Sequence, residues 1–268
     1  MRVGVPKEIK VLENRVGLTP ASVREFVAHG HEVLVEHDAG TGIGMGDDAY
    51  VAAGASIAAD AAAVFASADM IVKVKEPQPE ECSRLRKGQI LFTYLHLAPD
   101  PEQTKALVAS GAVCIAYETV TSRSGGLPLL APMSEVAGRM SVQAGAHFLE
   151  KPHGGKGILL GGVPGVAPAK VVILGGGVVG THAAMIALGM GANVTVLDRS
   201  LEALTVLWRQ FGPQLKTEFS SHDSVERHVT RADLVIGGVL IPGASAPKLV
   251  TAQMVRAMQP GSVVVDSS

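Results

Sequence analysis

The chain has 268 residues, of which 47% are hydrophobic, 18% charged and 4% aromatic, and its formal net charge is -2. This length favours two domains of ordinary size, and the apolar content excludes a disordered chain. Acidic and basic residues are interleaved, which argues against nucleic-acid or anionic-membrane partners and favours small molecules. A polar start and the lack of an apolar run of about 18 residues predict a cytoplasmic protein without a signal peptide or membrane span.

In the first half, short β-branched runs alternate with alanine-rich stretches, the pattern of βα units on a parallel sheet. We predict strands at Arg2–Val5, Glu32–Glu36, Ile71–Val74, Ile90–Tyr94 and Val113–Ala116, with helices such as Pro20–His29 and Pro101–Ser110 between them. These elements predict one α/β domain over residues 1–130. Cys82 and Cys114 have neither CxxC nor metal-ligand spacing, so we expect reduced thiols and no metal site.

A second domain is expected over residues 131–268. It begins with a predicted connector helix at Met133–Leu149, which has helical spacing with Ala and Gly on one face. Two further helices are predicted at Val179–Met190 and Leu201–Phe211, and strands at Val171–Leu174, Asn193–Leu197, Leu234–Ile236 and Ser262–Val265, with a short one near Thr217–Phe219. A full dinucleotide-binding fold has six strands, so these five predict a Rossmann domain that is incomplete at its C-terminus.

The segment KVVILGGGVVG places Gly175, Gly177 and Gly180 in a GxGxxG array after an apolar strand and at the start of a helix. The three glycines allow a tight turn, close approach of the backbone to a pyrophosphate, and close packing of helix on strand. A phosphate would then lie at the helix N-terminus, where N–H groups and the helix dipole favour an anion. Glycine-rich turns also occur for conformational reasons alone, but this context predicts a dinucleotide-binding loop.

Asp198 ends the next predicted strand, 23 residues after Gly175. That spacing is close to the roughly 20 residues expected for the carboxylate that binds the adenosine ribose hydroxyls. The alternative for this residue is a purely structural one, as the N-cap of the helix that starts at Leu201. A carboxylate here repels a 2′-phosphate and so favours NAD over NADP, although the neighbouring Arg199 is a residue that can accept such a phosphate.

Three polar residues of the first half follow strands or lie in the loop after one, where open α/β sheets bind ligands. Lys75 follows Ile71–Val74, His96 follows the segment LFTYL, and Arg15 lies in the loop after the first strand. A lysine and an arginine can fix a small carboxylate, and a histidine can transfer a proton as a carbonyl and an amine interconvert. The alternatives are a solvated lysine and a hydrogen-bonded structural histidine.

Six segments together resemble the alanine dehydrogenase family over the whole length of the chain. They are MRVGVPKEIKVLENRVGLTP, VKVKEP, LFTYLHLAP, APMSEVAGRMSVQAGAHFLEK, GGVPGVAPAKVVILGGGVVGTHAA and GGVLIPGASAPKLVT. The resemblance implies a substrate domain followed by an NAD-binding Rossmann domain. It also implies reversible, NAD-dependent oxidative deamination of L-alanine to pyruvate and ammonia, by a homo-oligomer that is a hexamer in the family.

The same resemblance implies roles for individual residues. Arg15 and Lys75 are expected to bind the substrate, and His96 to act as the acid/base. The residues implied in NAD binding, besides the glycines, are Ser134, Val178, Asp198, Ser220, Val239 and Leu240. The family often has a basic residue five positions after the aspartate, and because this chain has Ala203 there, we expect one contact to the adenosine to be absent.

The family normally continues past Val265 and Asp266 into an Asp-Gln-Gly-Gly segment with a second catalytic aspartate, whereas this sequence ends in Ser267 and Ser268. We therefore expect either a shortened form of the enzyme with impaired activity, or a chain whose remaining apolar surface is covered by another subunit. Three other readings stay open. The first is the NAD-binding part of a proton-translocating transhydrogenase alpha subunit, and the presence of His96 argues against it. The second is a non-catalytic NAD-binding or assembly protein. The third is a saccharopine-type amino acid dehydrogenase, whose motifs match this chain more weakly.

Overall fold

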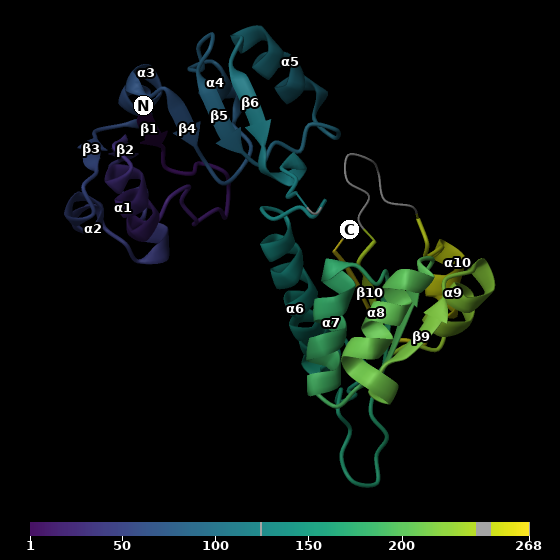
Figure 1. Cartoon of the computed structure of the whole chain (residues 1–268). Coiled ribbons are helices and arrows are strands. Elements are labelled where there is room, and N and C mark those ends of the chain that lie inside the picture. Colours follow the sequence, from purple (N-terminus) through teal and green to yellow (C-terminus); the bar gives the residue numbers. More distant parts are fainter. Residues whose placement is uncertain (124, 240–247, 268) are drawn as a thin grey trace. The chain divides into compact units, whose positions relative to one another are not determined.

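A computed structural model describes residues 1–123, 125–239 and 248–267 of the chain. The chain divides into two compact units, Met1–Leu129 and Leu130–Ser268. Each unit is built on a parallel sheet with helices on both faces (Figure 1). Among the described helices, none combines the length and the hydropathy of a membrane-spanning segment.

The first unit has a six-stranded sheet with the order β3-β2-β1-β4-β5-β6. Its strands, all parallel, are β1 (Arg2–Val5), β2 (Glu32–Glu36), β3 (Ser56–Ala58), β4 (Met70–Val72), β5 (Ile90–Thr93) and β6 (Val113–Ala116). The sequence predicted five of them and missed β3, a three-residue edge strand too short to show an apolar pattern. The predicted end of β4 was also wrong, because the Val74 N–H donates to the buried Glu8 carboxylate at 2.6 Å instead of to a neighbouring strand.

Helices cover both faces of this sheet. They are α1 (Pro20–Ala28), α2 (Asp47–Ala52), α3 (Ala61–Ser67), α4 (Pro79–Cys82) and α5 (Pro101–Ser110), with 3-10 turns η1 (Thr41–Ile43) and η2 (Tyr117–Thr119). One core joins Val3 and Val5 of β1 to α1 and α2, and the other joins Ile71 and Leu91 to α3, α4 and α5. The inner strands β1 and β4 are largely buried on both faces, which explains why their apolar runs do not alternate with polar residues.

The second unit has a five-stranded parallel sheet with the order β11-β10-β7-β8-β9. Its strands are β7 (Lys170–Leu174), β8 (Asn193–Asp198), β9 (Lys216–Phe219), β10 (Leu234–Gly237) and β11 (Val263–Asp266). Its helices are α6 (Ala131–Phe148), α7 (Val178–Gly189), α8 (Leu201–Phe211), α9 (His222–Val229) and α10 (Ala252–Ala257), with 3-10 turns η3 (Lys151–His153) and η4 (Gly212–Gln214). The five strands match the predicted positions to within one residue at each end.

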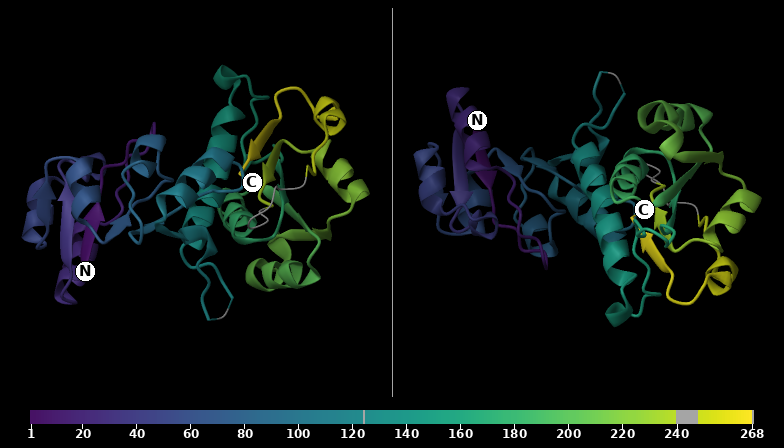
Figure 2. Two further views of the ribbon diagram at one scale, coloured as in Figure 1. Left: turned by 90° about the horizontal axis from the view of Figure 1, so that it is seen from above. Right: turned by 90° about the horizontal axis from the view of Figure 1, so that it is seen from below.

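Alternate residues of β7 face two different cores in this unit. Val171 and Ile173 pack toward α6, α7 and α8, whereas Val172 and Leu174 pack toward α9 and α10. Figure 2 shows helices on both sides of this sheet. Helix α6 begins two residues before the predicted start and packs along α7, where a Cβ on Gly138 would lie 2.2 Å from the Val179 carbonyl oxygen. The predicted connector helix is therefore an integral layer of the second unit.

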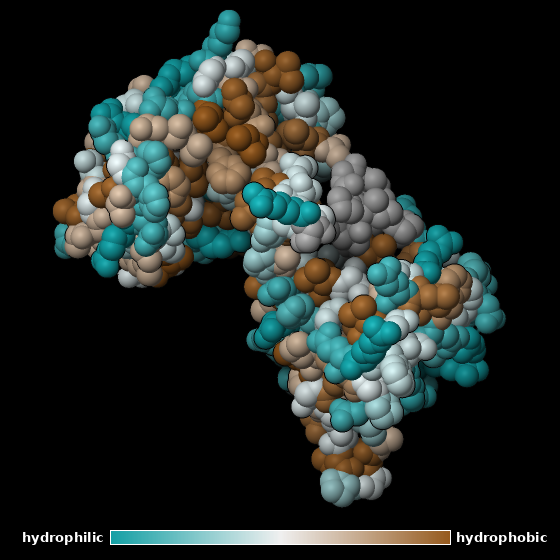
Figure 3. Space-filling view, viewed as in Figure 1, coloured by the Kyte–Doolittle hydropathy of each residue, from teal (hydrophilic) through white to brown (hydrophobic). Residues whose placement is uncertain are grey.

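A loop over residues 155–169 joins η3 to β7. Its base is buried through Leu160 and Ala169, while Leu159, Val163 and Val166 are 54–64% exposed. In the orientation of Figure 1 this loop lies at the foot of the second unit, where Figure 3 shows apolar surface. The loop thus presents an apolar tip on an otherwise mixed surface.

Candidate functional site

The three glycines of the GxGxxG array differ in what surrounds them. Gly175 has a φ of 101°, which only glycine adopts without strain, and a Cβ on Gly180 would lie 1.8 Å from the Gly175 carbonyl oxygen. A Cβ on Gly177 would meet no heavy atom of the described residues within 4 Å. The first glycine is thus needed for the turn and the third for packing of α7 on β7, whereas the second faces open space that a ligand can enter.

The N-terminus of α7 lies at this open space. Gly177 is the N-cap of this 12-residue helix, and no side chain caps it. The first N–H groups of an α-helix have no partner inside the helix, and together with the helix dipole they favour an anion. The loop therefore offers what a phosphate requires, namely unpaired backbone donors and room for close approach.

Asp198 lies at the end of β8, directly beside the glycine loop. Its Oδ2 accepts the Gly176 N–H at 2.5 Å, and its Oδ1 accepts the Ser200 N–H at 2.7 Å. The N-cap of α8 is not Asp198 but Ser200, whose Oγ accepts the Ala203 N–H at 3.1 Å, so the capping alternative for Asp198 is wrong. Because an ionised carboxylate has about four acceptor positions, Asp198 retains capacity for two hydroxyl donors.

The other predicted cofactor residues have different surroundings. The Ser220 N–H donates to the Asp198 carbonyl at 2.9 Å, and a Cβ on Gly175 would lie 3.0 Å from Val239 Cγ2. Val178 is the first residue of α7 and is 42% exposed, and Ser134 lies in the first turn of α6. The structure thus brings Val178, Ser220 and Val239 to the glycine loop or to Asp198. Leu240 lies outside the described residues.

In the first unit, Arg15 is held by a carboxylate. Its Nε and Nη2 donate to the two oxygens of Glu13 at 2.8 and 2.6 Å. These hydrogen bonds are the main reason why the pKa of Glu13 is lowered to about 2, and the charge of Lys75 lowers it further. Arg15 is 47% exposed while Glu13 is only 8% exposed, so the pair presents the guanidinium outward next to Lys75.

His96 follows β5 in a left-handed backbone conformation, with a φ of 48°. The Glu118 carboxylate accepts the N–H of Leu95 at 3.1 Å and the N–H of His96 at 2.7 Å, which holds this conformation. The imidazole itself is exposed. Glu118 therefore positions His96 through the backbone, and among the described residues neither ring nitrogen has a hydrogen-bond partner.

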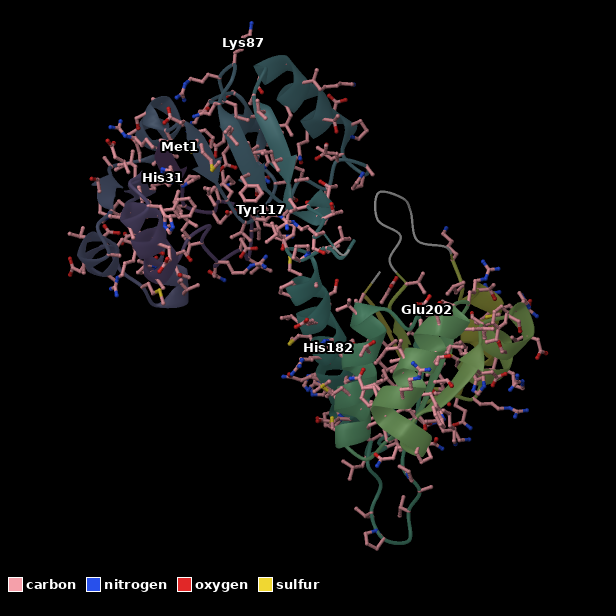
Figure 4. All side chains as sticks on the ribbon, in the orientation of Figure 1. Met1, His31, Lys87, Tyr117, His182 and Glu202 are labelled. Atoms are coloured by element: carbon pink, nitrogen blue, oxygen red, sulfur yellow. The ribbon has the colours of Figure 1, made fainter. Side chains whose placement is uncertain are left out.

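Tyr94 lies between the predicted residues. Its ring stacks on the His96 ring with centroids 6.4 Å apart, and Tyr117, labelled in Figure 4, packs edge-on against it at 4.9 Å. Burial raises the pKa of the Tyr94 hydroxyl, and the nearby Arg15 charge opposes that shift. Tyr94 thus contacts His96 directly, and the charge of Arg15 acts on Tyr94 while that of Lys75 acts on Glu13.

A buried ionic group supports the backbone that leads to Lys75. The ammonium of Lys73, whose side chain is 1% exposed, lies 2.5 Å from Glu81 and 3.3 Å from Glu8. Glu8 accepts the Val74 N–H, and burial raises the pKa of its carboxyl. One Glu8 oxygen, Oε2, has no hydrogen-bond partner in the described structure, although the Lys73 charge faces it.

Sequence reasoning missed four groups that surround the predicted residues, namely Glu13, Tyr94, Glu118 and the Lys73 group. Glu13 lies two positions before Arg15 in the same loop, so spacing could have suggested the pair. Glu118 is 22 positions from His96 and carries no local signal. The assembled groups can bind a small carboxylate at Arg15 and Lys75, move a proton at His96, and bind a dinucleotide at the second unit's glycine loop.

Two family models match the chain. The model described as "Alanine dehydrogenase/PNT, N-terminal domain" matches residues 4–137, and its C-terminal counterpart matches residues 141–268. The alanine dehydrogenase of Halomonas elongata is 59% identical over 266 residues, which cover 99% of this chain and 72% of that protein. The alanine dehydrogenase of Bacillus subtilis is 58% identical, with 99% of this chain and 70% of that protein covered.

Solved structures show the same likeness to alanine dehydrogenases. A structure of L-alanine dehydrogenase superposes with a TM-score of 0.93 at 53% identity, over 99% of this chain and 73% of that one. The transhydrogenase from Sinorhizobium meliloti superposes with a TM-score of 0.83 at 30% identity, over 98% of this chain and 77% of that one. The likeness to the first is greater in both fold and sequence.

Proposed function

Because the chain belongs to the alanine dehydrogenase/PNT family, we propose that it deaminates L-alanine to pyruvate and ammonia with NAD as the oxidant. The observation that carries this proposal is the Asp198 carboxylate bonded to the glycine loop, in a chain that matches both domains of the family. The likeness to alanine dehydrogenases at 53–59% identity favours this reaction over that of a transhydrogenase.

The cofactor site that we propose consists of the glycine loop, the start of α7 and Asp198. The open space at Gly177 and the uncapped N-terminus of α7 fit a pyrophosphate, and Asp198 fits the adenosine ribose. A carboxylate at this position repels a 2′-phosphate, which favours NAD over NADP. NAD held by these residues would supply a hydride acceptor for the oxidation of alanine. Ser134, Val178, Ser220, Val239 and Leu240 complete the proposed set.

Arg15 and Lys75 would hold the substrate carboxylate. Glu13 takes two of the five N–H donors of Arg15, so the guanidinium is oriented but still has donors for a second carboxylate. Lys75 adds a second positive charge near Glu13. Fixing the substrate at two points places its Cα for hydride transfer, an effect of positioning as much as of charge.

His96 would act as the acid and base. Oxidation of the amine yields an imine, and His96 would take a proton from the water that attacks it and then return a proton to the departing ammonia. His96 is exposed and its backbone is fixed by Glu118, so the residue is positioned without a hydrogen bond from its ring to any described residue. The raised pKa of Tyr94 keeps the neighbouring phenol protonated.

The experiment that tests this assignment is His96→Ala. We expect alanine-dependent NADH formation to fall about 10²- to 10⁴-fold, the usual contribution of a general acid/base, with NAD affinity within about twofold of the parent. His222→Ala, at a 79% exposed histidine of the second unit, is the matched control and should leave both quantities unchanged. Unaltered turnover would remove His96 from the mechanism, and NAD binding without any turnover in the parent chain would contradict the proposed enzymatic activity.

The expected homo-oligomer is a separate prediction. A measurement of hydrodynamic size in solution checks it.

A further inference from the structure

We propose that His147, Glu150 and His153 form a binding site for a divalent transition-metal ion such as Zn²⁺. One nitrogen or oxygen atom from each residue lies within 4.8 Å of the others, and all three residues are exposed. The two imidazole rings lie with centroids 3.8 Å apart at an interplanar angle of 39°, and His153 Nε2 lies 3.6 Å from Glu150 Oε2. None of these residues belongs to the proposed alanine or NAD sites.

The backbone brings the three side chains together before any ion binds. His147 is in the last turn of α6, and the Glu150 N–H donates to the His147 carbonyl at 3.2 Å. The next turn repeats this arrangement, because the His153 N–H donates to the Glu150 carbonyl at 3.1 Å. Consecutive ligands are therefore one turn apart on the same side of the chain.

Packing on the opposite side fixes this segment. Leu149 is fully buried, and a Cβ on Gly155 would lie 2.2 Å from the Leu149 backbone. The Gly157 N–H also donates to the Leu149 carbonyl at 2.8 Å. A site on such a segment loses little conformational freedom when an ion binds, which favours affinity.

The donor set determines the class of ion. Two imidazoles and one carboxylate are the three protein ligands found at open zinc sites, where water or another ligand takes the fourth position. Imidazole nitrogen favours Zn²⁺, Cu²⁺ and Ni²⁺ over Mg²⁺ or Ca²⁺, which prefer oxygen. His153 also lines a groove of about 490 Å³ with Phe148 and residues 261–266, so the remaining position of the ion is open to solvent.

The test is titration of the full chain with Zn²⁺ by calorimetry. We expect His147→Gln and His153→Gln each to weaken Zn²⁺ binding by roughly tenfold or more, because changing a residue that only supports a metal ligand already costs about 10–100-fold. With Cu²⁺ as the probe, electron paramagnetic resonance should show two nitrogen ligands in the parent chain and one in each variant. All three side chains are exposed, so the variants should fold normally.

Two control variants separate this site from general histidine binding. His222→Gln removes an exposed histidine of the same unit, and His37→Gln disrupts the other described group with metal-ligand spacing, His37, Asp38 and Asp47. Both should leave the Zn²⁺ affinity of the site unchanged. Equal affinity in His147→Gln and the parent, or equal loss in the His222→Gln control, would show that the three residues form only an ordinary surface ion pair and ring contact.

Discussion

Glu13 shows how one side chain can orient another at the proposed substrate site. It is almost buried, and the two hydrogen bonds from Arg15 keep its carboxyl ionised well below its usual pKa. The ion pair therefore persists throughout the neutral range, and Arg15 stays oriented whether or not a substrate is present. This coupling predicts a measurable pH dependence of stability.

A carboxyl with a lowered pKa in the folded state adds stability that is fully present above its unfolded value of 4.5 and is lost as the pH falls toward 2. We expect the difference in the free energy of unfolding between the parent and Glu13→Gln to be constant above about pH 5 and to shrink below it. Urea titrations between neutral pH and about pH 3 measure this difference. A difference that does not change with pH would mean that Glu13 and Arg15 are not paired in solution.

Lys73 presents the opposite case, a charge with almost no access to water. Lys73→Met leaves Glu8 and Glu81 buried without their counter-charge, and we expect it to reduce the free energy of unfolding by about 3–5 kcal/mol. The triple variant Glu8→Gln, Lys73→Met, Glu81→Gln removes all three charges but keeps acceptors for the Val74 and Gln78 N–H groups. In urea unfolding, the triple variant should recover most of the free energy of unfolding that Lys73→Met loses. If it does not, the destabilisation comes from lost packing and not from unpaired charge.

At the scale of elements, the junction between β8 and α8 assigns two roles to Asp198 and Ser200, which are two positions apart. Ser200 caps α8, while Asp198 bonds to the glycine loop. A short polar residue before a helix is often its cap, so sequence alone left both roles to Asp198. The observed hydrogen bonds separate them.

This division predicts opposite effects of two alanine substitutions. Ser200→Ala should lower the free energy of unfolding by about 1 kcal/mol, the usual value of an N-cap, and leave NAD affinity unchanged. Asp198→Ala should weaken NAD binding by about 1.5–3 kcal/mol, as the loss of hydrogen bonds to a charged group does. Calorimetry with NAD and urea unfolding of both variants measure the two quantities. Equal NAD affinity in Asp198→Ala and the parent would leave Asp198 with a structural role only.

At the scale of the whole molecule, each unit has its own pair of cores, one on each face of its sheet. The proposed substrate residues all lie in Met1–Leu129, and the proposed cofactor residues all lie in Leu130–Ser268. Binding of NAD should therefore stabilise the second unit directly, without need of His96 in the first.

We expect NAD at about 100 times its Kd to stabilise the second unit by roughly 2.7 kcal/mol. Hydrogen exchange should slow at the glycine loop and the first turn of α7, to the same extent in His96→Ala as in the parent. Exchange followed by mass spectrometry, with and without NAD, measures this. Protection confined to the first unit, or absent from the loop, would contradict the proposed cofactor site.

Much of the fold was predictable because its signals are local. The sequence predicted ten of the eleven described strands, most of them from short apolar runs, and the spacing of Gly175, Gly177, Gly180 and Asp198 marked the predicted dinucleotide loop. The rule that ligands bind beyond the carboxyl ends of parallel strands was enough to select Lys75 and His96.

Only the tertiary structure decided how those residues are supported. The Glu8 carboxylate ends β4 from 66 positions away, and Glu118 holds His96 from 22 positions away. Neither contact leaves a pattern in neighbouring residues, because partners across a sheet are brought together by strand order and not by spacing along the chain. The candidate site residues and the glycine turn thus follow from local sequence, whereas their hydrogen-bond partners and burial follow from which strands lie side by side.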